Sequence, residues 1–384
     1  MAQPIVTVQQ QSQFVSNSKD LPRYKRHIQL QQAQELGHGT GGINGFAFSP
    51  DGQWLASSYN VIGSRGQVRL WKADRQSWFQ QIQDLYQSSS GSSIHALSFS
   101  PDSQRLASGS YSAVSGGKVC LWQADWQGQF QQAQELQSGG GRIFALAFSP
   151  DSQWLASGVY STSSGGRICL WQADRQGQFQ QAQELKSGSG RICTLTFSPD
   201  SQWLVSGEHN LSSSRGRICL WQLERQGRFQ QVQELEHSGS AIGIHALAFS
   251  PDGQWLASGD KDTGRGGRVC LWQADRQGQF QQAQELKHSG GVIDALAFSP
   301  DGQWLTSGDY GANCGGRICL WQADGQGRFQ QAQELEHSGS GIGICALAFS
   351  PDGQRLASGE HNLSSGEGRV RLWQADRQSQ PVPA

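Results

Sequence analysis

Short runs of alternating hydrophobic and polar residues recur along most of the chain, in groups of four. In the block 293–335, the first run, IDALAFS, alternates small and large apolar residues, which is typical of a strand packed on both faces between neighbouring sheets. The runs QWLTSG and RICLWQA follow, and the last run, FQQAQEL, is polar enough for an outer edge strand. No stretch has a helical period long enough to compete. The block therefore predicts a four-stranded antiparallel meander.

Copies of this block recur every 49 to 52 residues. Their Phe-Ser-Pro triplets begin at Phe48, Phe99, Phe148, Phe197, Phe249, Phe298 and Phe349. A fixed period of this size is typical of a propeller or a solenoid. The Asp-Gly or Asp-Ser that follows each Pro predicts a turn, because Pro sets φ and the next residues complete the reversal. We therefore predict an all-β fold, a seven-bladed β-propeller of four-stranded antiparallel blades, with repeats starting near residues 43, 94, 143, 192, 244, 293 and 344.

The two ends of the chain complement each other. The run LQQAQEL at 30–36 matches a fourth strand, but no repeat precedes it. The seventh copy stops near Asp376 and lacks a fourth strand. We predict that the N-terminal strand pairs with the last blade and closes the ring, because a closed ring removes exposed end blades. Residues 1–26, rich in Gln and Ser, are expected to form a polar tail, and 27–384 a single propeller domain.

The motifs FSPDG, LASG and [IV]xLW, repeated seven times in order, resemble the WD-repeat family of β-propellers across roughly residues 28–376. The near-identical copies resemble its prokaryotic type. This resemblance implies a non-catalytic scaffold or recognition module that binds a protein or peptide partner. The chain departs from the family where Gln123 and its equivalents replace the Asp after the third-strand Trp. The family's Gly-His pair survives only at 37–38, and histidines stand at similar places at His237, His288 and His337. The family's buried His-Ser-Asp-Trp tetrad is therefore expected to be absent or rebuilt.

Charge and motif content narrow the function classes. The net charge is −1, so no sequence-wide field favours nucleic acid or a membrane surface. No apolar run approaches the ~20 residues of a membrane span, and the N-terminus lacks the features of a signal peptide. We expect a monomeric, cytoplasmic protein with no membrane and no specific nucleic-acid partner. No P-loop, dinucleotide fingerprint, HExxH, GxSxG or EF-hand loop occurs, so neither an enzyme nor a cofactor is expected.

The eight cysteines do not predict disulfides. Five share one third-strand position: Cys120, Cys169, Cys219, Cys270 and Cys319. Equivalent positions of successive blades lie too far apart for the ~5.5 Å Cα separation of a disulfide, so we expect small buried hydrophobes in a reducing compartment. Cys193 and Cys345 share a second position, and Cys314 lies in a predicted loop. No Cys or His pairing has zinc spacing, so no metal site is predicted.

One face of the predicted propeller varies more than the other. On the face with the turns after the first and third strands, Ser-Pro-Asp and Gln-Ala-Asp-Arg-Gln-Gly recur almost unchanged. On the opposite face, two sets of positions differ between copies. Two residues past the second-strand motif stand Asn60, Tyr111, Tyr160, His209, Lys261, Tyr310 and His361. At the start of the first strand stand Asn44, His95, Phe144, Cys193, His245, Asp294 and Cys345.

This difference between faces has two explanations. Surface loops drift freely, but drift predicts similar scatter on both faces. We therefore favour a recognition surface around the mouth of the central channel, since Tyr, His, Phe and Asn suit amphipathic contacts. All members of both sets except the two cysteines are predicted to bind the partner. The competing hypothesis is a small-ligand or glycan-binding propeller that uses pockets between blades.

A basic residue precedes the third-strand Ile or Val in six copies, at Lys118, Arg167, Arg217, Arg268, Arg317 and Arg369. Six positive charges near one rim could attract an acidic partner or a phosphate. Each could equally pair with a nearby acid, and the candidates are Glu208, Asp260, Asp309 and Glu360. We favour local pairing.

Overall fold

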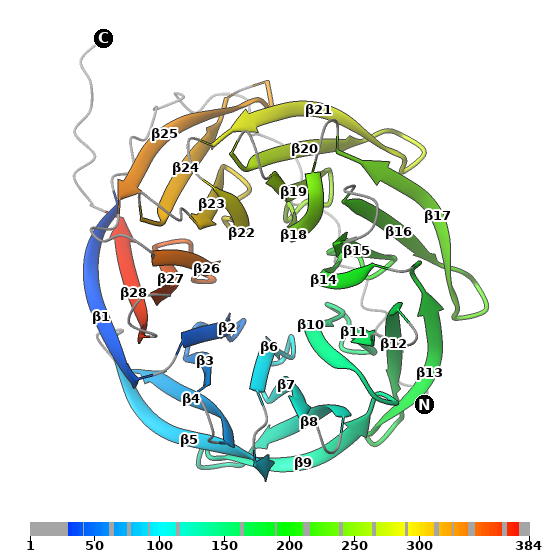
Figure 1. Cartoon of the computed structure of the whole chain (residues 1–384), viewed down its shortest axis with the longest axis vertical. Coiled ribbons are helices and arrows are strands. Elements are labelled where there is room, and N and C mark those ends of the chain that lie inside the picture. Colours follow the sequence, from blue (N-terminus) through cyan, green and yellow to red (C-terminus); the bar gives the residue numbers. More distant parts are fainter. Residues whose placement is uncertain are drawn as a thin grey trace, which may run out of the picture.

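A computed structural model shows an all-β ring of seven blades around a central opening (Figure 1). It describes residues 30–40, 42–60, 65–74, 78–90, 93–112, 116–161, 165–188, 190–209, 216–237, 241–262, 266–288, 291–310, 315–324, 326–336, 342–362 and 367–375. Within these ranges, all 28 regular elements are strands. No helix among them is long and apolar enough to cross a membrane. The predicted fold class is confirmed.

Each blade is an antiparallel sheet whose first strand lines the opening and whose fourth strand lies at the rim (Figure 1). The first strands are β2 (Gly42–Phe48), β6 (Ser93–Phe99), β10 (Arg142–Phe148), β14 (Arg191–Phe197), β18 (Ala241–Phe249), β22 (Val292–Phe298) and β26 (Ile342–Phe349). The second strands are β3 (Trp54–Asn60), β7 (Arg105–Ser112), β11 (Trp154–Ser161), β15 (Trp203–His209), β19 (Trp255–Asp262), β23 (Trp304–Tyr310) and β27 (Arg355–Asn362).

The outer strands of each blade follow in the same order. The third strands are β4 (Arg65–Ala73), β8 (Gly116–Ala124), β12 (Gly165–Ala173), β16 (Arg217–Leu223), β20 (Arg268–Ala274), β24 (Arg317–Ala323) and β28 (Glu367–Ala375). The fourth strands are β5 (Phe79–Ser90), β9 (Phe130–Gln137), β13 (Phe179–Lys186), β17 (Phe229–Glu236), β21 (Phe280–Lys287), β25 (Phe329–Glu336) and, for blade 7, β1 (Leu30–Thr40). Single bridging pairs also join blades 4 and 5 and blades 6 and 7.

The hydrophobic core lies between the blades. Seven clusters of buried apolar side chains are present, and each draws on two neighbouring blades. One cluster packs Trp54 and Val68 of blade 1 against Phe99 and Leu106 of blade 2. Because one blade buries little apolar surface by itself, its stability depends on its neighbours.

Strand β1 completes the seventh blade. It pairs antiparallel with β28, and Leu30 lies opposite Ala375. The side-chain amide of Gln333 on β25 then clamps Leu30, accepting from its N–H at 2.9 Å and donating to its carbonyl at 3.2 Å. The same clamp, from a fourth-strand Gln to the next fourth-strand Phe, joins 34 to 79, 83 to 130, 134 to 179, 183 to 229, 233 to 280 and 284 to 329. The predicted pairing of the two ends is confirmed, while the predicted tail 1–26 lies outside the described residues.

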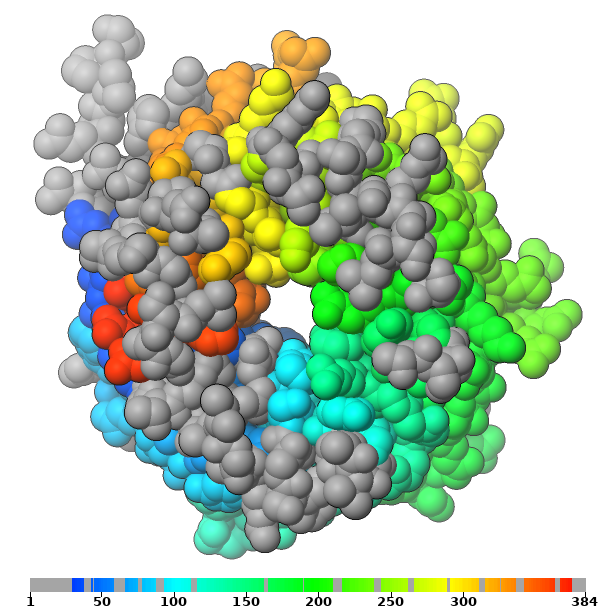
Figure 2. Space-filling model, in the orientation of Figure 1, coloured from blue at the N-terminus to red at the C-terminus, as the bar shows by residue number. Residues whose placement is uncertain are grey.

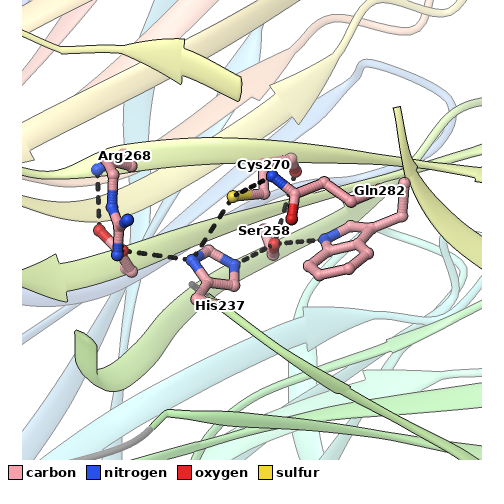
Figure 3. Close-up of polar contacts among 7 residues, drawn as sticks. His237, Ser258, Arg268, Cys270 and Gln282 are labelled. Atoms are coloured by element: carbon pink, nitrogen blue, oxygen red, sulfur yellow. Dashed lines mark hydrogen bonds and ion pairs between the residues drawn. The ribbon is translucent and has the colours of Figure 1, made fainter. Parts of the chain in front are cut away.

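The buried tetrad is rebuilt in blade 5 (Figure 3). His237 Nε2 lies 2.6 Å from Ser258 Oγ, which also accepts from the Trp272 indole at 2.7 Å. The acid is Asp260, whose Oδ2 lies 3.2 Å from His237 Nδ1 and which comes from the end of β19. Burial alone would raise the pKa of Asp260, but hydrogen bonds from His237 and the Arg268 N–H hold it below its ordinary value.

Two other blades keep parts of this network. In blade 6, His288 Nδ1 lies 3.1 Å from Asp309 Oδ2, and the Trp321 indole donates to Ser307 at 2.8 Å. In blade 2, Gln87 replaces the histidine and donates to Ser108 Oγ at 2.8 Å. His337 lies outside the described residues. The tetrad is therefore fully rebuilt in blade 5, with an acid from the second strand in place of the family's turn Asp. In blade 6 it is only partly rebuilt, because the described residues offer the His288 ring no hydrogen bond.

Candidate recognition site

A β-bulge near the start of every first strand carries one of the two varied residue sets. On β10, Ile143 pairs with Val159 and Ala145 pairs with Gly158, so Phe144 between them has no partner in the ladder. The seven bulged residues are Asn44, His95, Phe144, Cys193, His245, Asp294 and Cys345. A bulge turns its extra side chain away from the regular alternation and is common beside functional sites.

The second varied set lies directly beside the bulges. Tyr160 pairs with Arg142, and His209 pairs with Arg191, two positions before the bulge in each case. The same register holds in the other five blades. Both predicted sets therefore meet at one end of the two inner strands, around the central opening. The side chains of Asn44 and Asn60 lie outside the described part of the chain.

Bulged residues contact their counterparts in the next blade. The rings of His95 and Phe144 have centroids 5.4 Å apart. His245 Nδ1 lies 2.9 Å from Asp294 Oδ1, across blades 5 and 6. The thiol of Cys345 donates to the backbone carbonyl of Ile43 at 3.3 Å. These residues are therefore neighbours around the channel mouth, although 49 residues separate His245 from Asp294 in the chain and 302 separate Cys345 from Ile43.

A pocket of about 440 Å³ opens on this face across blades 2, 3 and 4. These blades form the cyan-to-green side of the central opening (Figure 2). The pocket is lined by Tyr111, Gly141, Arg142, Phe144, Tyr160, Ser161, Arg191 and His209. The Arg142 guanidinium lies 4.8 Å from the centroid of the Tyr111 ring, and that of Arg191 lies 4.6 Å from the Phe144 ring. Such cation–π contacts hold a guanidinium in place over the ring.

The pocket carries net positive charge. None of its lining residues is acidic, and no ion pair of Arg142 or Arg191 with a carboxylate occurs among the described residues. Burial, with the charges of Arg142 and Arg191, lowers the pKa of His95 beside the pocket to about 4. Burial, with the charges of His245, Arg191 and Lys261, lowers the pKa of His209 to about 4. Both imidazoles are therefore neutral at pH 7, and the charge resides on the two arginines.

Arg142 and Arg191 were not among the residues predicted to bind a partner. The equivalent position holds Gly42, Ser93, Gly243, Val292 and Gly343 in the other five blades. A comparison of the copies at this third position would have found them. Of the predicted binding residues, only Tyr111, Phe144, Tyr160 and His209 line the pocket. The others occupy the same strand ends in other blades or, like His95 and His245, stand beside its lining.

The six basic rim residues pair locally, as favoured above. Lys118 pairs with Glu135 at 2.8 Å, and Arg268 pairs with Asp260 at 2.8 Å. The further pairs are Arg167 with Glu184, Arg217 with Glu208 and Glu234, Arg317 with Glu334, and Arg369 with Glu35 and Glu367. Of the four acids named as possible partners, Glu208 and Asp260 pair with rim residues, whereas Asp309 accepts from the Arg317 backbone N–H and Glu360 pairs with Arg371.

The cysteines of the described residues are free thiols, as predicted. The five at the shared third-strand position are buried. Burial, with the nearby Glu135 carboxylate, raises the pKa of Cys120 to about 12, so this thiol stays protonated and unreactive. Cys193 and Cys345 are partly exposed at the bulges, and Cys314 lies outside the described residues.

A family model described as "WD domain, G-beta repeat" matches the chain seven times, over residues 30–72, 79–123, 130–172, 179–222, 229–273, 280–322 and 329–374. The chain belongs to the WD40 family. Each matched WD40 repeat begins on the fourth strand of one blade and ends on the third strand of the next, so the repeats interlock the blades. A search of curated proteins found no match. WD40 repeats generally form scaffolds for protein–protein interaction.

Proposed function

We propose that this WD40 propeller is a non-catalytic recognition module for a protein or peptide partner, which binds on the varied face around the channel mouth. One observation carries the proposal. Two guanidinium groups lie over aromatic rings in a concave pocket, and no carboxylate of the described residues pairs with them. We propose further that this pocket receives an acidic group of the partner.

The chemistry of the pocket supports an acidic group. A guanidinium presents a planar fork of N–H donors that matches a carboxylate. The whole chain has a net charge of only −1, so the positive charge of Arg142 and Arg191 is a local feature. Tyr and Arg are also the residue types that most often dominate binding energy at protein interfaces.

The size of the pocket supports a peptide rather than a flat protein surface. A volume of about 440 Å³ accommodates a side chain or a chain end, with the rest of the segment lying across neighbouring blades. The varied side chains beyond the pocket, among them Lys261, Tyr310 and His361, would then contact flanking residues of the segment. In this arrangement, substitution of a few of the varied residues would change which peptide binds, while the blades that hold them stay the same.

A glycan is the alternative ligand. Sugars commonly pack against open aromatic faces, but one face of the Tyr111 ring and one face of the Phe144 ring are each covered by a guanidinium. This coverage favours an anionic group over a neutral sugar as the ligand of the pocket.

The decisive experiment is selection of peptides from a random display library, followed by affinity measurement on purified variants. We expect the selected peptides to contain Asp, Glu or a required free C-terminus. Arg142→Ala and Arg191→Ala should each weaken binding roughly 10- to 100-fold, because each removes a charge-assisted contact. The affinity should also fall as salt rises from about 50 to about 500 mM.

The matched control is Arg175→Ala. Arg175 is exposed in the turn after the third strand of blade 3, on the opposite face, and its loss changes the net charge by the same amount. The affinity of the Arg175→Ala variant for the selected peptides should equal that of the wild type. Equal weakening by all three variants would contradict the site, and selective binding of neutral glycans that is lost in Tyr111→Ala would favour the alternative.

A further inference from the structure

A cluster of metal-ligating side chains lies at the junction of blades 4 and 5, next to the pocket, with which it shares His209. Cys193 is the bulged residue of β14, His209 ends β15, and His245 is the bulged residue of β18. One ligand atom from each of these residues lies within 4.8 Å of the other two. In Figure 1 the three strands lie side by side at the inner edge of the ring.

The spacing of the two imidazoles fits a tetrahedral metal ion. His209 Nδ1 and His245 Nε2 are 3.3 Å apart. Two nitrogen ligands at about 2.05 Å from a tetrahedral Zn²⁺ are separated by about 3.3 Å, and a nitrogen and a thiolate ligand by about 3.6 Å. The nitrogen pair already has the required separation. The Cys193 sulfur needs a shift of at most about 1.2 Å, within reach of a side-chain rotation on a bulged strand.

The carboxylate of Asp294 contacts the ring nitrogen of His245 that faces away from the cluster. His245 Nδ1 lies 2.9 Å from Asp294 Oδ1. When this nitrogen donates to the carboxylate, the neutral ring presents its Nε2 lone pair toward His209 and Cys193. Metal-binding histidines are commonly oriented in this way by a carboxylate on the other ring nitrogen. The contact from blade 6 therefore prepares the lone pair that a metal ion requires.

Among the blade junctions whose side chains the structure describes, this combination of one cysteine and two histidines occurs only between blades 4 and 5. Blade 7 repeats two of its members at the same positions, Cys345 and His361, but the next bulged residue there is Asn44. The Cys345 thiol donates to the backbone carbonyls of Ile43 and Gly359, both at 3.3 Å. Cys345 thus provides a matched comparison in the same chain, with the same local backbone and no second histidine at the bulge.

We propose that Cys193, His209 and His245 form a zinc site that links blades 4 and 5 at the channel mouth, with its fourth position open. A thiolate and two imidazoles suit Zn²⁺ and not Mg²⁺ or Ca²⁺, which prefer oxygen ligands. The Cys193 thiol releases its proton to solvent as the Zn–S bond forms. This proposal does not depend on the peptide ligand of the pocket.

Arg191 competes with the metal ion. Its Nε donates to Cys193 Sγ at 3.2 Å, and one of its terminal nitrogens lies 3.4 Å from His209 Nδ1. The guanidinium must leave these lone pairs when a cation binds. Removal of this positive charge by Arg191→Ala should therefore tighten metal binding severalfold, an effect that a purely structural role for the cluster does not predict.

The test is titration of the full, reduced chain with Co²⁺ and then Zn²⁺. We expect one Co²⁺ per chain, with intense visible d–d bands of a four-coordinate ion and a thiolate-to-cobalt charge-transfer band, both lost when Zn²⁺ displaces Co²⁺. Zn²⁺ at a hundredfold excess over its Kd should raise Tm by about 3 °C. Peptide affinity is measured separately, so failure of either proposal leaves the other testable.

Variants separate this site from other thiols and imidazoles. Cys193→Ser should abolish the charge-transfer band, and Asp294→Asn should weaken Zn²⁺ binding about 10- to 100-fold. Cys345→Ser, the matched control, should retain both the spectrum and the affinity. The proposal is overturned if wild type shows no thiolate-to-cobalt band, or if Cys193→Ser and Cys345→Ser bind Zn²⁺ equally. Thermal unfolding without metal verifies that each variant is folded.

Discussion

At the scale of single residues, the bulge determines what each blade presents at the channel mouth. His95 illustrates how strongly this position depends on its neighbours. Its Nε2 lies 2.9 Å from Ser93 Oγ, and its ring packs against Phe144 of the next blade. Burial, followed by the positive charges of Arg142 and Arg191, lowers its pKa from 6.5 to about 4. The folded protein therefore resists protonation of a side chain that the unfolded chain readily protonates.

This shift predicts a pH-dependent stability that His95→Gln should reduce. Between pH 6.5 and about 4 the unfolded chain binds a proton at His95 that the folded protein does not, so stability is full above pH 6.5 and falls with pH across this window. Protonation of His95 in the unfolded chain lowers the free energy of unfolding by up to about 3 kcal/mol across this window. We expect the variant to lose less free energy of unfolding between pH 7 and pH 4.5, measured by urea titration. The difference at pH 8 reports the change in packing alone, and identical pH profiles would contradict the prediction.

At the scale of strands, the blades are held at a spacing set by glycine. A Cβ on Gly158 of β11 would lie 2.6 Å from Ile192 Cγ2 of the next blade, and equally close approaches occur at 109, 259 and 308. Blade 1 carries Ser58 at this position, and its strand partner is Gly45 where most other blades have Ala. The small second-strand residue therefore lets neighbouring sheets approach closely enough to bury their shared core.

A pair of identical substitutions tests this spacing. Gly158→Ala should destabilise the protein by about 1–3 kcal/mol, because the added methyl overpacks the interface with Ile192. Gly359→Ala is the matched control, since its nearest neighbour would be Ile43 Cγ2 at 3.5 Å, an ordinary contact. There the loss of unfolded-state entropy should leave stability unchanged or raise it by about 0.4–1 kcal/mol. Thermal and urea unfolding of both variants measure the difference, and equal effects would refute the proposed close contact.

At the scale of the whole molecule, closure depends on two segments far apart in the chain. Leu36 of β1 packs with Val370 and Leu372 of β28, and the same cluster includes Ile43 and Leu55 of blade 1. The first and last blades thus share one core cluster, as every other pair of neighbours does. Without β1, strand β28 would become an exposed edge with unpaired backbone groups.

Removal of residues 1–40 should therefore destabilise the ring by several kcal/mol, because it uncovers the cluster around Leu36 and Val370 and leaves β28 unpaired. We expect a lower Tm and concentration-dependent association, measured by calorimetry and light scattering. The control removes residues 1–29 and leaves β1 intact; its Tm should match that of the full chain. Equal Tm values for all three proteins would show that β1 does not stabilise the ring.

The sequence by itself determined the architecture of this protein. A period of 49 to 52 residues and alternating runs were sufficient for seven blades, and the fourth-strand run at 30–36 was sufficient for closure, because these features are local patterns repeated many times. The two varied residue sets were also visible from comparison of the copies. The acids that pair with Arg317 and Arg369 could not be assigned from the sequence, because pairing depends on which neighbouring strand presents its carboxylate.

Only the tertiary structure decided which varied residues act together. The one-residue bulges place His95 against Phe144, and Arg191 against Cys193 and His209. The cluster of Cys193, His209 and His245 draws on three strands of two blades, so no short spacing in the sequence marks it. A repeat pattern specifies each blade and its neighbours, whereas contacts across the channel mouth depend on how adjacent blades align and on where each bulge turns its side chain.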